Sequence, residues 1–377
     1  MNNKVIITAD DYGVCDRIDR GIEAAIAANK LTSVSAIITH EDSLERVKRL
    51  YDLQQKKAKE GQPFGIGLHL CITSGKPQSQ SSVGSLVAKD GNFHEASYYP
   101  FGTAKADHLK DEIKAQFEKI SKAIPIKELD HLTNHHGIVY FKQDLFEAFV
   151  DVAAEHKVSV RSPMSWHPKF KKFEELPDFD ENPIGNPTIR RGMKIGVWRK
   201  LGQVSYGNLV RRMEYSEEKK VNYPDVLCEF IYGQCTPKRN NGVKVMEHVF
   251  HQFMDPADRE TENKNRPKKE EIVVDRVGIA LANQHTIDQA YSKIKNGGAN
   301  GKHEVVSRYG SKKYTGDFSV ELMFHLAERN VPTPSEIHGI NMDYFVNREH
   351  ELDALLAIDL EKFKNKLKLS YIPYKDL

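Results

Sequence analysis

The sequence predicts an α/β protein built on a parallel sheet, because strand patterns alternate with amphipathic helix patterns over residues 4–163. Residues 4–9 are rich in β-branched side chains and run into a helical pattern, and "SVSAII" at 33–38 follows as a second strand. Residues 107–124 then place their apolar side chains on one helical face. Strands separated by helices form either a (β/α) barrel or an open doubly wound sheet, and the pattern alone does not choose between them.

Each further element follows from a local pattern. In the first helix Ile18, Ile22 and Ile26 recur at helical spacing, and Asp16 is expected to be its N-cap. Further strands are expected at 64–72, 158–163 and 317–327, a strand with a loop at 129–140, and a helix at 144–156. The segment from "NREHELDALLA" to "LSYIPYKDL" is expected to form one or two helices and a closing strand.

A change of composition divides the chain. Residues 166–304 hold many Pro, Asn and Lys residues, as in "ETENKNRPKKEE", and the strand rhythm is lost there. Such charged runs are typical of solvated surface. We therefore expect residues 1–377 to form a single α/β domain with an insertion or lid region at about 166–304.

Composition excludes several classes of protein. The net charge of +2 gives no electrostatic basis for binding nucleic acid or an anionic membrane, and no apolar run approaches the roughly 20 residues of a membrane span. Residues 1–4 lead into the first strand without the features of a signal peptide, so a cytoplasmic protein is expected. The cysteines form neither a disulfide framework nor a zinc spacing, and we interpret all of them as free thiols: Cys15, Cys71, Cys228 and Cys235.

Acidic and imidazole side chains gather near the predicted strand ends, where parallel α/β folds form their sites. They are Asp10 and Asp11 in "TADDYG", His69 in "GLHL", His131, His135 and His136 in "HLTNHH", and His325 after "VELMF". One carboxylate and two imidazoles make three protein ligands for a metal ion and leave positions open for water. A bound cation would stabilise one aspartate as an anion, and the other could act as a general base on a water molecule.

Each of these residues also has a purely structural interpretation. An aspartate at a strand end commonly caps a turn or helix, and His69 could be a hydrogen-bonded core histidine. His135 and His136 could be an exposed loop pair; because adjacent side chains of an extended chain point in opposite directions, we expect only one of them to be a ligand. Their joint occurrence at successive strand ends is what favours a site.

Four segments occur in the order in which they are found in one family. "TADDYG" before a helix, "GIGLHLCITSGKP", "HLTNHH" and "VELMFH", together with the ending "NREHELDALLA", resemble the YdjC-like (ChbG-type) carbohydrate deacetylases. The resemblance covers about residues 1–165 and 305–377. It implies a distorted TIM-like (β/α) barrel with a long insertion, and a metal-dependent hydrolase that removes acetyl groups from N-acetylated sugars such as chitooligosaccharides.

The resemblance also implies roles for single residues. Asp11, His69 and His135 would be the metal ligands, and Asp10 would be the base. By analogy with other metal-dependent polysaccharide deacetylases, His325 would be the acid that protonates the leaving amine, and Arg161 would orient or compensate a carboxylate. The donor set favours Zn²⁺, whereas the family is also associated with Mg²⁺, so we expect one divalent ion of either kind.

The chain departs from the family pattern within two of these segments. Thr133 stands where the family usually has a carboxylate, and Gly137 and Val139 replace part of a histidine-rich run. Leu326 and Ala327 follow His325 in place of the family's Pro-Gly. These changes indicate an outlying subgroup whose substrate could differ.

The insertion offers further candidates. Trp166 and Trp198 could stack on sugar rings or could form a local core. His248 and His251, beside Glu247, would share one face of a helix and could bind a second metal.

Two other functions are compatible with the same residues. The Asp/His/His site could hydrolyse a phosphoester or a different amide, or the chain could be a non-catalytic sugar-binding protein on a decayed barrel. The expected partner is a small carbohydrate substrate, with neither nucleic acid nor membrane, and a homo-oligomer is left open.

Overall fold

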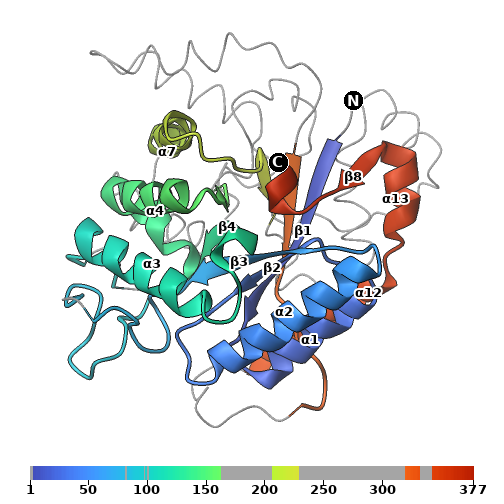
Figure 1. Cartoon of the computed structure of the whole chain (residues 1–377), viewed down its shortest axis with the longest axis horizontal. Helices are drawn as coiled ribbons and strands as arrows, with labels where there is room; N and C mark the ends of the chain where they lie inside the picture. The colour runs from blue at the N-terminus through green and yellow to red at the C-terminus, as the bar shows by residue number, and fades with distance from the viewer. Residues whose placement is uncertain are drawn as a thin grey trace.

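A parallel sheet forms the centre of the computed structural model, which describes residues 3–80, 83–96, 98–99, 102–162, 206–228, 319–331 and 342–377 (Figure 1). The strands are β1 (Asn3–Tyr12), β2 (Ser33–Ala36), β3 (Gly65–Leu70), β4 (Leu129–Asn134), β5 (Ser159–Val160), β6 (Val226–Cys228), β7 (Ser319–Phe324) and β8 (Leu369–Tyr371). Their order is β5-β4-β3-β2-β1-β7-β6, with β8 paired to β1. The sheet curls into a half-barrel surrounded by helices, which confirms the α/β prediction and is consistent with a distorted TIM-like barrel.

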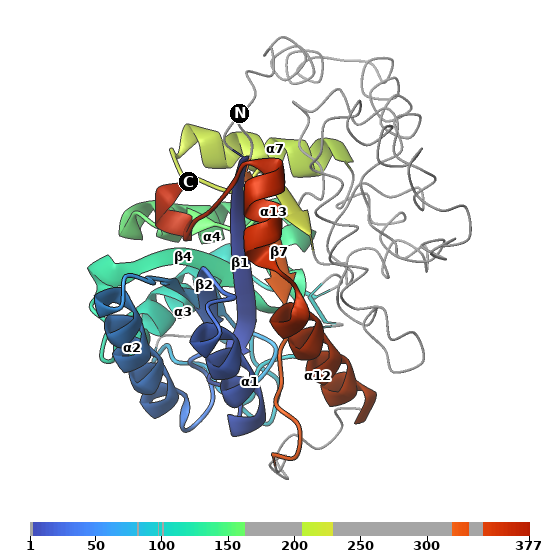
Figure 2. The ribbon, with the colours of Figure 1, turned by 90° about the vertical axis from the view of Figure 1, so that its right-hand side faces the viewer.

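Helices follow most strands and lie outside the sheet (Figure 2). They are α1 (Asp16–Ala27), α2 (Ser43–Lys59), α3 (Ala106–Ile120), α4 (Gln143–His156), α7 (Tyr206–Glu218), α12 (Met342–Ala357) and α13 (Leu360–Leu367). The apolar faces expected from the sequence are buried, as shown by Ile18 and Ile22 of α1 and Ile113 and Phe117 of α3. Each such side chain contributes about 1.5–3 kcal/mol when it is removed from water.

β1 is an interior strand of the sheet, with neighbours along both edges. It pairs with β7 from Lys4 to Ala9 on one side. On the other side β8 covers its first residues, Asn3 to Val5, and β2 pairs with its second half from Thr8 to Tyr12. The carboxyl end of β1 is therefore held between β2 and β7, where catalytic and binding residues of parallel α/β folds converge.

The sequence analysis misplaced or missed several elements. Asp16 is the first residue of α1, and Cys15 takes the N-cap position in its place. The helix α2 was not predicted, because its long polar and charged stretches hide a narrow apolar stripe. The strand expected at 158–163 is only Ser159–Val160. β6 lies inside the range expected to be an insertion, so the expected loss of strands is wrong at 226–228.

The concave face of the sheet is polar near the middle of the strands. His131 of β4 passes over β3 and meets the Ser35 hydroxyl of β2 at 3.0 Å from its Nε2, while its Nδ1 lies 2.5 Å from Asp130 Oδ1. Tyr374, after β8, stacks on the His131 ring with 4.4 Å between centroids. Gly67 makes this possible: a Cβ there would lie 2.2 Å from the His131 ring. The histidines of the "HLTNHH" motif therefore have different roles, since His131 belongs to the barrel core.

Candidate active site

Asp10 and Asp11 reach the same site because β1 is irregular at its end. Adjacent side chains of a regular strand point to opposite faces. Here the register between β1 and β2 shifts between Ala9 and Tyr12, and Asp11 takes a left-handed backbone conformation with φ of 73°. As a result Asp10 Oδ2 and Asp11 Oδ1 lie 3.7 and 3.3 Å from one atom, His69 Nε2. A bulge of this kind re-aims side chains next to functional sites.

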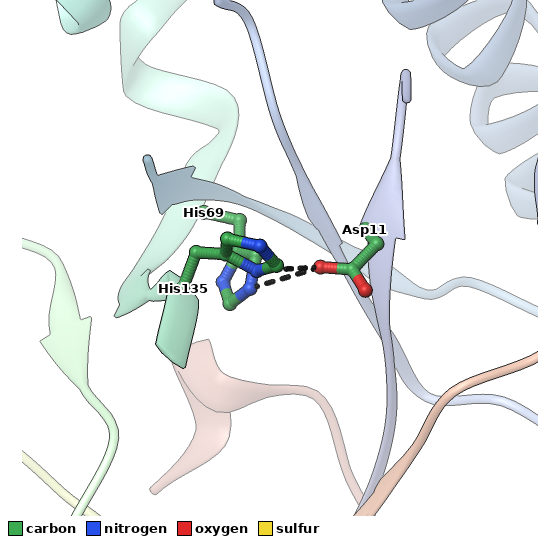
Figure 3. Close-up of side chains that lie close together, drawn as sticks. All are labelled: Asp11, His69 and His135. Carbon is green, nitrogen blue, oxygen red and sulfur yellow. Dashed lines mark ion pairs between the residues drawn. The ribbon is translucent and has the colours of Figure 1, made fainter. Parts of the chain in front are cut away.

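Asp11, His69 and His135 converge from three different elements (Figure 3). Asp11 lies next to the last residue of β1, His69 lies in β3, and His135 begins the 3₁₀ segment His135–Phe141 directly after β4. Asp11 Oδ1 is 3.0 Å from His135 Nδ1, and the three ligand atoms lie within 4.8 Å of one another. This arrangement can hold a cation with one oxygen and two nitrogens, the donor set expected of Zn²⁺ sites.

The surroundings of the three side chains fit a metal ion. Asp11 Oδ1 is buried and receives no hydrogen bond of good geometry from the described residues. Its other oxygen, Oδ2, is held by Arg348 from α12. Burial alone would raise the pKa of Asp11, but His135 and Arg348 hold that pKa well below its usual range. The carboxylate is therefore anionic at neutral pH, with Oδ1 directed at the two imidazoles.

Thr133 takes up the orienting contact that a carboxylate would otherwise make. Its Oγ1 lies 2.7 Å from His69 Nδ1, from the neighbouring strand β4. A partner on the far nitrogen of a ligand histidine fixes both its tautomer and the direction of its ring. The departure at Thr133 therefore leaves His69 with a hydrogen-bond partner.

His136 does not join the three candidate ligands. Its Nδ1 lies 3.0 Å from the Thr73 hydroxyl. The expectation that His135 and His136 point in opposite directions is wrong, since their rings lie 3.8 Å apart. The cause is the backbone, because His136 has φ of 60° within the 3₁₀ segment and the chain is not extended there.

Asp10 forms a buried ionic network with Arg161 and Glu321. Arg161 donates to Asp10 at 2.5 and 2.9 Å and to Glu321 at 2.6 and 3.0 Å, and all three side chains are buried. Burial acts to raise the pKa of Asp10, but Arg161 and His69 lower it further than burial raises it. The Asp10 carboxylate is thus ionised and held in place by Arg161. The same guanidinium also pairs with Glu321.

His325 lies at the end of β7 on the same side of the sheet. Its backbone N–H donates to Glu351 Oε2 of α12 at 2.8 Å. Burial and the nearby Arg348 lower the pKa of His325 to about 3, against the opposing effects of Asp11 and Asp10. Its imidazole is therefore neutral at neutral pH.

Sequence reasoning missed three charged residues around the site. Glu321 is a lone carboxylate in the apolar strand "SVELMF", and that position was itself a signal. In the sequence, Arg348 and Glu351 resemble the ordinary charged residues of a surface helix. Their spacing of three residues, which puts both on one helix face, was the signal available there.

Candidates in the predicted insertion lie outside the described residues. These are Trp166, Trp198, Glu247, His248 and His251. Within the described part of the chain, the helices are too short or too polar to cross a membrane.

A curled parallel sheet with one carboxylate and two imidazoles at its strand ends defines an α/β protein with a candidate metal centre. The sequence model of the family described as YdjC-like protein matches residues 4–366. The chain belongs to this family, as its motifs indicated.

Relatives with assigned names share parts of the chain. It is 26% identical over 258 residues to "Carbohydrate deacetylase 2" of Listeria innocua, covering 67% of this chain and 93% of that one. It is 30% identical over 159 residues to a "Carbohydrate deacetylase" of Clostridium beijerinckii, covering 42% of this chain and 59% of that protein. It is 24% identical over 163 residues to a "Chitooligosaccharide deacetylase" of Salmonella enteritidis PT4, covering 43% and 60%.

A solved structure has the same fold. The crystal structure of a putative cellobiose-phosphate cleavage protein from Enterococcus faecalis superimposes with a TM-score of 0.57 at 16% identity, covering 100% of this chain and 99% of that one. At this level of identity the likeness concerns the fold alone.

Proposed function

We propose that the protein is a metal-dependent hydrolase that removes the acetyl group from an N-acetylated sugar and releases acetate and a free amine. One observation carries the proposal: the ligand atoms of Asp11, His69 and His135 lie within 4.8 Å of one another. Asp10 in β1 and His325 after β7 interact electrostatically with each other and with His69. The names of the relatives point to the same reaction.

The resident ion would be held by Asp11 Oδ1, His69 Nε2 and His135 Nδ1. A divalent cation at this place supplies Lewis acidity toward an acetamide carbonyl and lowers the pKa of a water molecule. Two imidazoles favour Zn²⁺ over Mg²⁺, which prefers an all-oxygen shell. We keep both ions as candidates and assign the choice to the experiment below.

Asp10 would accept the proton of the attacking water. Its carboxylate cannot swing away, because Arg161 grips both of its oxygens. His325 would give a proton to the leaving nitrogen. Because its imidazole is neutral at neutral pH, His325 would gain that proton within the catalytic cycle, and Asp10, which interacts with it electrostatically, is the group that could pass it on.

The sugar would lie across the carboxyl ends of the strands, where the three ligand side chains converge. We propose further that the chain is one domain, and that residues in the range 166–304 supply walls for the sugar. The oligomeric state stays open.

Acetate release tests this function. The full chain is purified, its bound metal is measured by mass spectrometry, and it is incubated with N-acetylglucosamine oligomers with and without a chelator. We expect about one equivalent of a divalent ion, chelator-sensitive acetate release, and a loss of about 100-fold or more for Asp10→Asn. Asp52→Asn, an exposed position on α2, is the matched control and should match the wild type.

Three outcomes would overturn the proposal. Turnover of generic phosphoesters without acetate release would assign the site to another bond. A protein that binds no metal, or whose acetate release is indifferent to Asp10→Asn, would exclude the mechanism.

A further inference from the structure

The segment that follows β7 is held by the buried carboxyl group of Glu351. His325 donates its backbone N–H to Glu351 Oε2 at 2.8 Å, and Glu351 is fully buried on α12. A carboxyl group is costly to bury unless it is hydrogen-bonded. Here its contact is with the residue that carries the candidate acid, so the position of that imidazole depends on α12.

The same face of α12 also reaches the candidate metal ligands. Arg348 lies one helical turn before Glu351 and donates to Asp11 Oδ2. Residues three apart share one face of a helix. One turn of α12 thus contacts both Asp11, at the end of β1, and His325, at the end of β7.

The helix α1 holds the rest of the segment. The Glu328 N–H donates to the Arg17 carbonyl at 2.8 Å. Gly21 packs so closely on Ala327 that a Cβ there would lie 2.7 Å from its backbone. Arg17 also pairs with Glu349, which ties α1 to α12, and the two helices lie side by side in Figure 2. The segment from His325 to Glu328 is therefore held by contacts with two helices, α1 and α12.

We propose that Glu351 is a positioning residue that fixes His325 for proton transfer, so that α12 is a working part of the active site. This inference deepens the proposed function and rests on it. Glu351 touches no reacting atom itself; it acts through the backbone of His325. An imidazole displaced by about 1 Å from its productive place can cost about 100-fold in rate.

A conservative variant is available at this position. Burial raises the pKa of Glu351 to about 8, so the side chain is mainly the neutral acid at neutral pH. Glutamine has the same shape, is also neutral, and keeps an oxygen that can accept the His325 N–H. Methionine has a similar volume but offers no comparable acceptor.

The experiment compares Glu351→Gln and Glu351→Met in the full chain, with Asp353→Met as the control for an exposed substitution in the same helix. We expect Glu351→Met to lower kcat for acetate release about 10- to 100-fold, with KM and the affinity for Zn²⁺ within about twofold. Glu351→Gln should recover most of the lost kcat. A fall in KM or metal affinity without a fall in kcat would overturn the proposal.

A double variant separates positioning from a general structural effect. If Glu351 acts through His325, then Glu351→Met should cause no further loss of kcat in a His325→Ala background. An equal loss in both backgrounds would show that Glu351 acts elsewhere.

Hydrogen exchange of the His325 amide gives a readout without activity. The amide should exchange faster in Glu351→Met than in the wild type, Glu351→Gln or Asp353→Met, and unchanged exchange would refute the contact. A wild-type chain without acetate release would overturn the proposed function and the role of His325 as acid. The exchange result would then decide separately whether Glu351 holds the segment.

Discussion

Replacing Thr133 by valine removes one hydroxyl and leaves a β-branched side chain of nearly the same shape in β4. The hydroxyl lies 2.7 Å from His69 Nδ1. When Nε2 faces a cation, Nδ1 carries the proton and donates it to Thr133 Oγ1. The valine variant therefore leaves a buried N–H without its acceptor, and it frees the His69 ring to turn.

The size of the effect follows from two contributions. The lost hydrogen bond is worth about 1 kcal/mol, and the buried N–H left without a partner costs about 1 kcal/mol more. A loss of about 2 kcal/mol corresponds to about 30-fold in affinity. This value falls within the 10- to 100-fold commonly lost when the partner of a ligand histidine is removed.

Competition with a chromophoric chelator measures the dissociation constant of Zn²⁺ for each variant. Thr133→Val should bind Zn²⁺ about 30-fold more weakly than the wild type. Thr133→Ser keeps the hydroxyl and should stay within about threefold. If valine and wild type bind Zn²⁺ equally, then Thr133 does not orient His69, or His69 is not a ligand.

Two other predictions concern stability. Gly67→Ala should destabilise the fold by about 2 kcal/mol or more, because the new methyl group would overlap the His131 ring, whereas Gly84→Ala faces open space and should change little; urea denaturation compares them. Because the folded-state pKa of Glu351 is about 8, above its unfolded value, the folded protein retains a proton that the unfolded chain has lost over the window between these pKa values. The wild type should therefore lose on the order of 5 kcal/mol as pH rises through that window, and parallel stability curves for wild type and Glu351→Gln would contradict this.

The sequence was sufficient for the main elements of the fold and for the inventory of the site. Apolar runs identified most of the strands beside β1, and strand ends identified where Asp11, His69 and His135 would lie. The parallel topology then brings these side chains together, since the carboxyl ends of parallel strands lie at one edge of the sheet. The family motifs then favoured a distorted TIM-like barrel over an open sheet.

The features that could not be predicted from the sequence depend on backbone detail and on contacts between residues far apart in the chain. No residue pattern announces the register shift that turns Asp10 and Asp11 to one side, because alternation assumes a regular strand. Arg348 contacts Asp11 across a sequence separation of 337 residues, which no local pattern encodes. β6 has only three residues and lies in a range read as an insertion, and its pairing with β7 identifies it as a strand.

The left-handed backbone at Asp11 sets which residues that position tolerates. Among residues with a side chain, Asn and Asp adopt φ near 73° at least cost, and Glu does so less readily. Asp11→Asn is therefore a clean removal of charge, whereas Asp11→Glu changes both the reach of the carboxylate and the preference of the chain. The short acid is required here by the bend of the strand as much as by any cation.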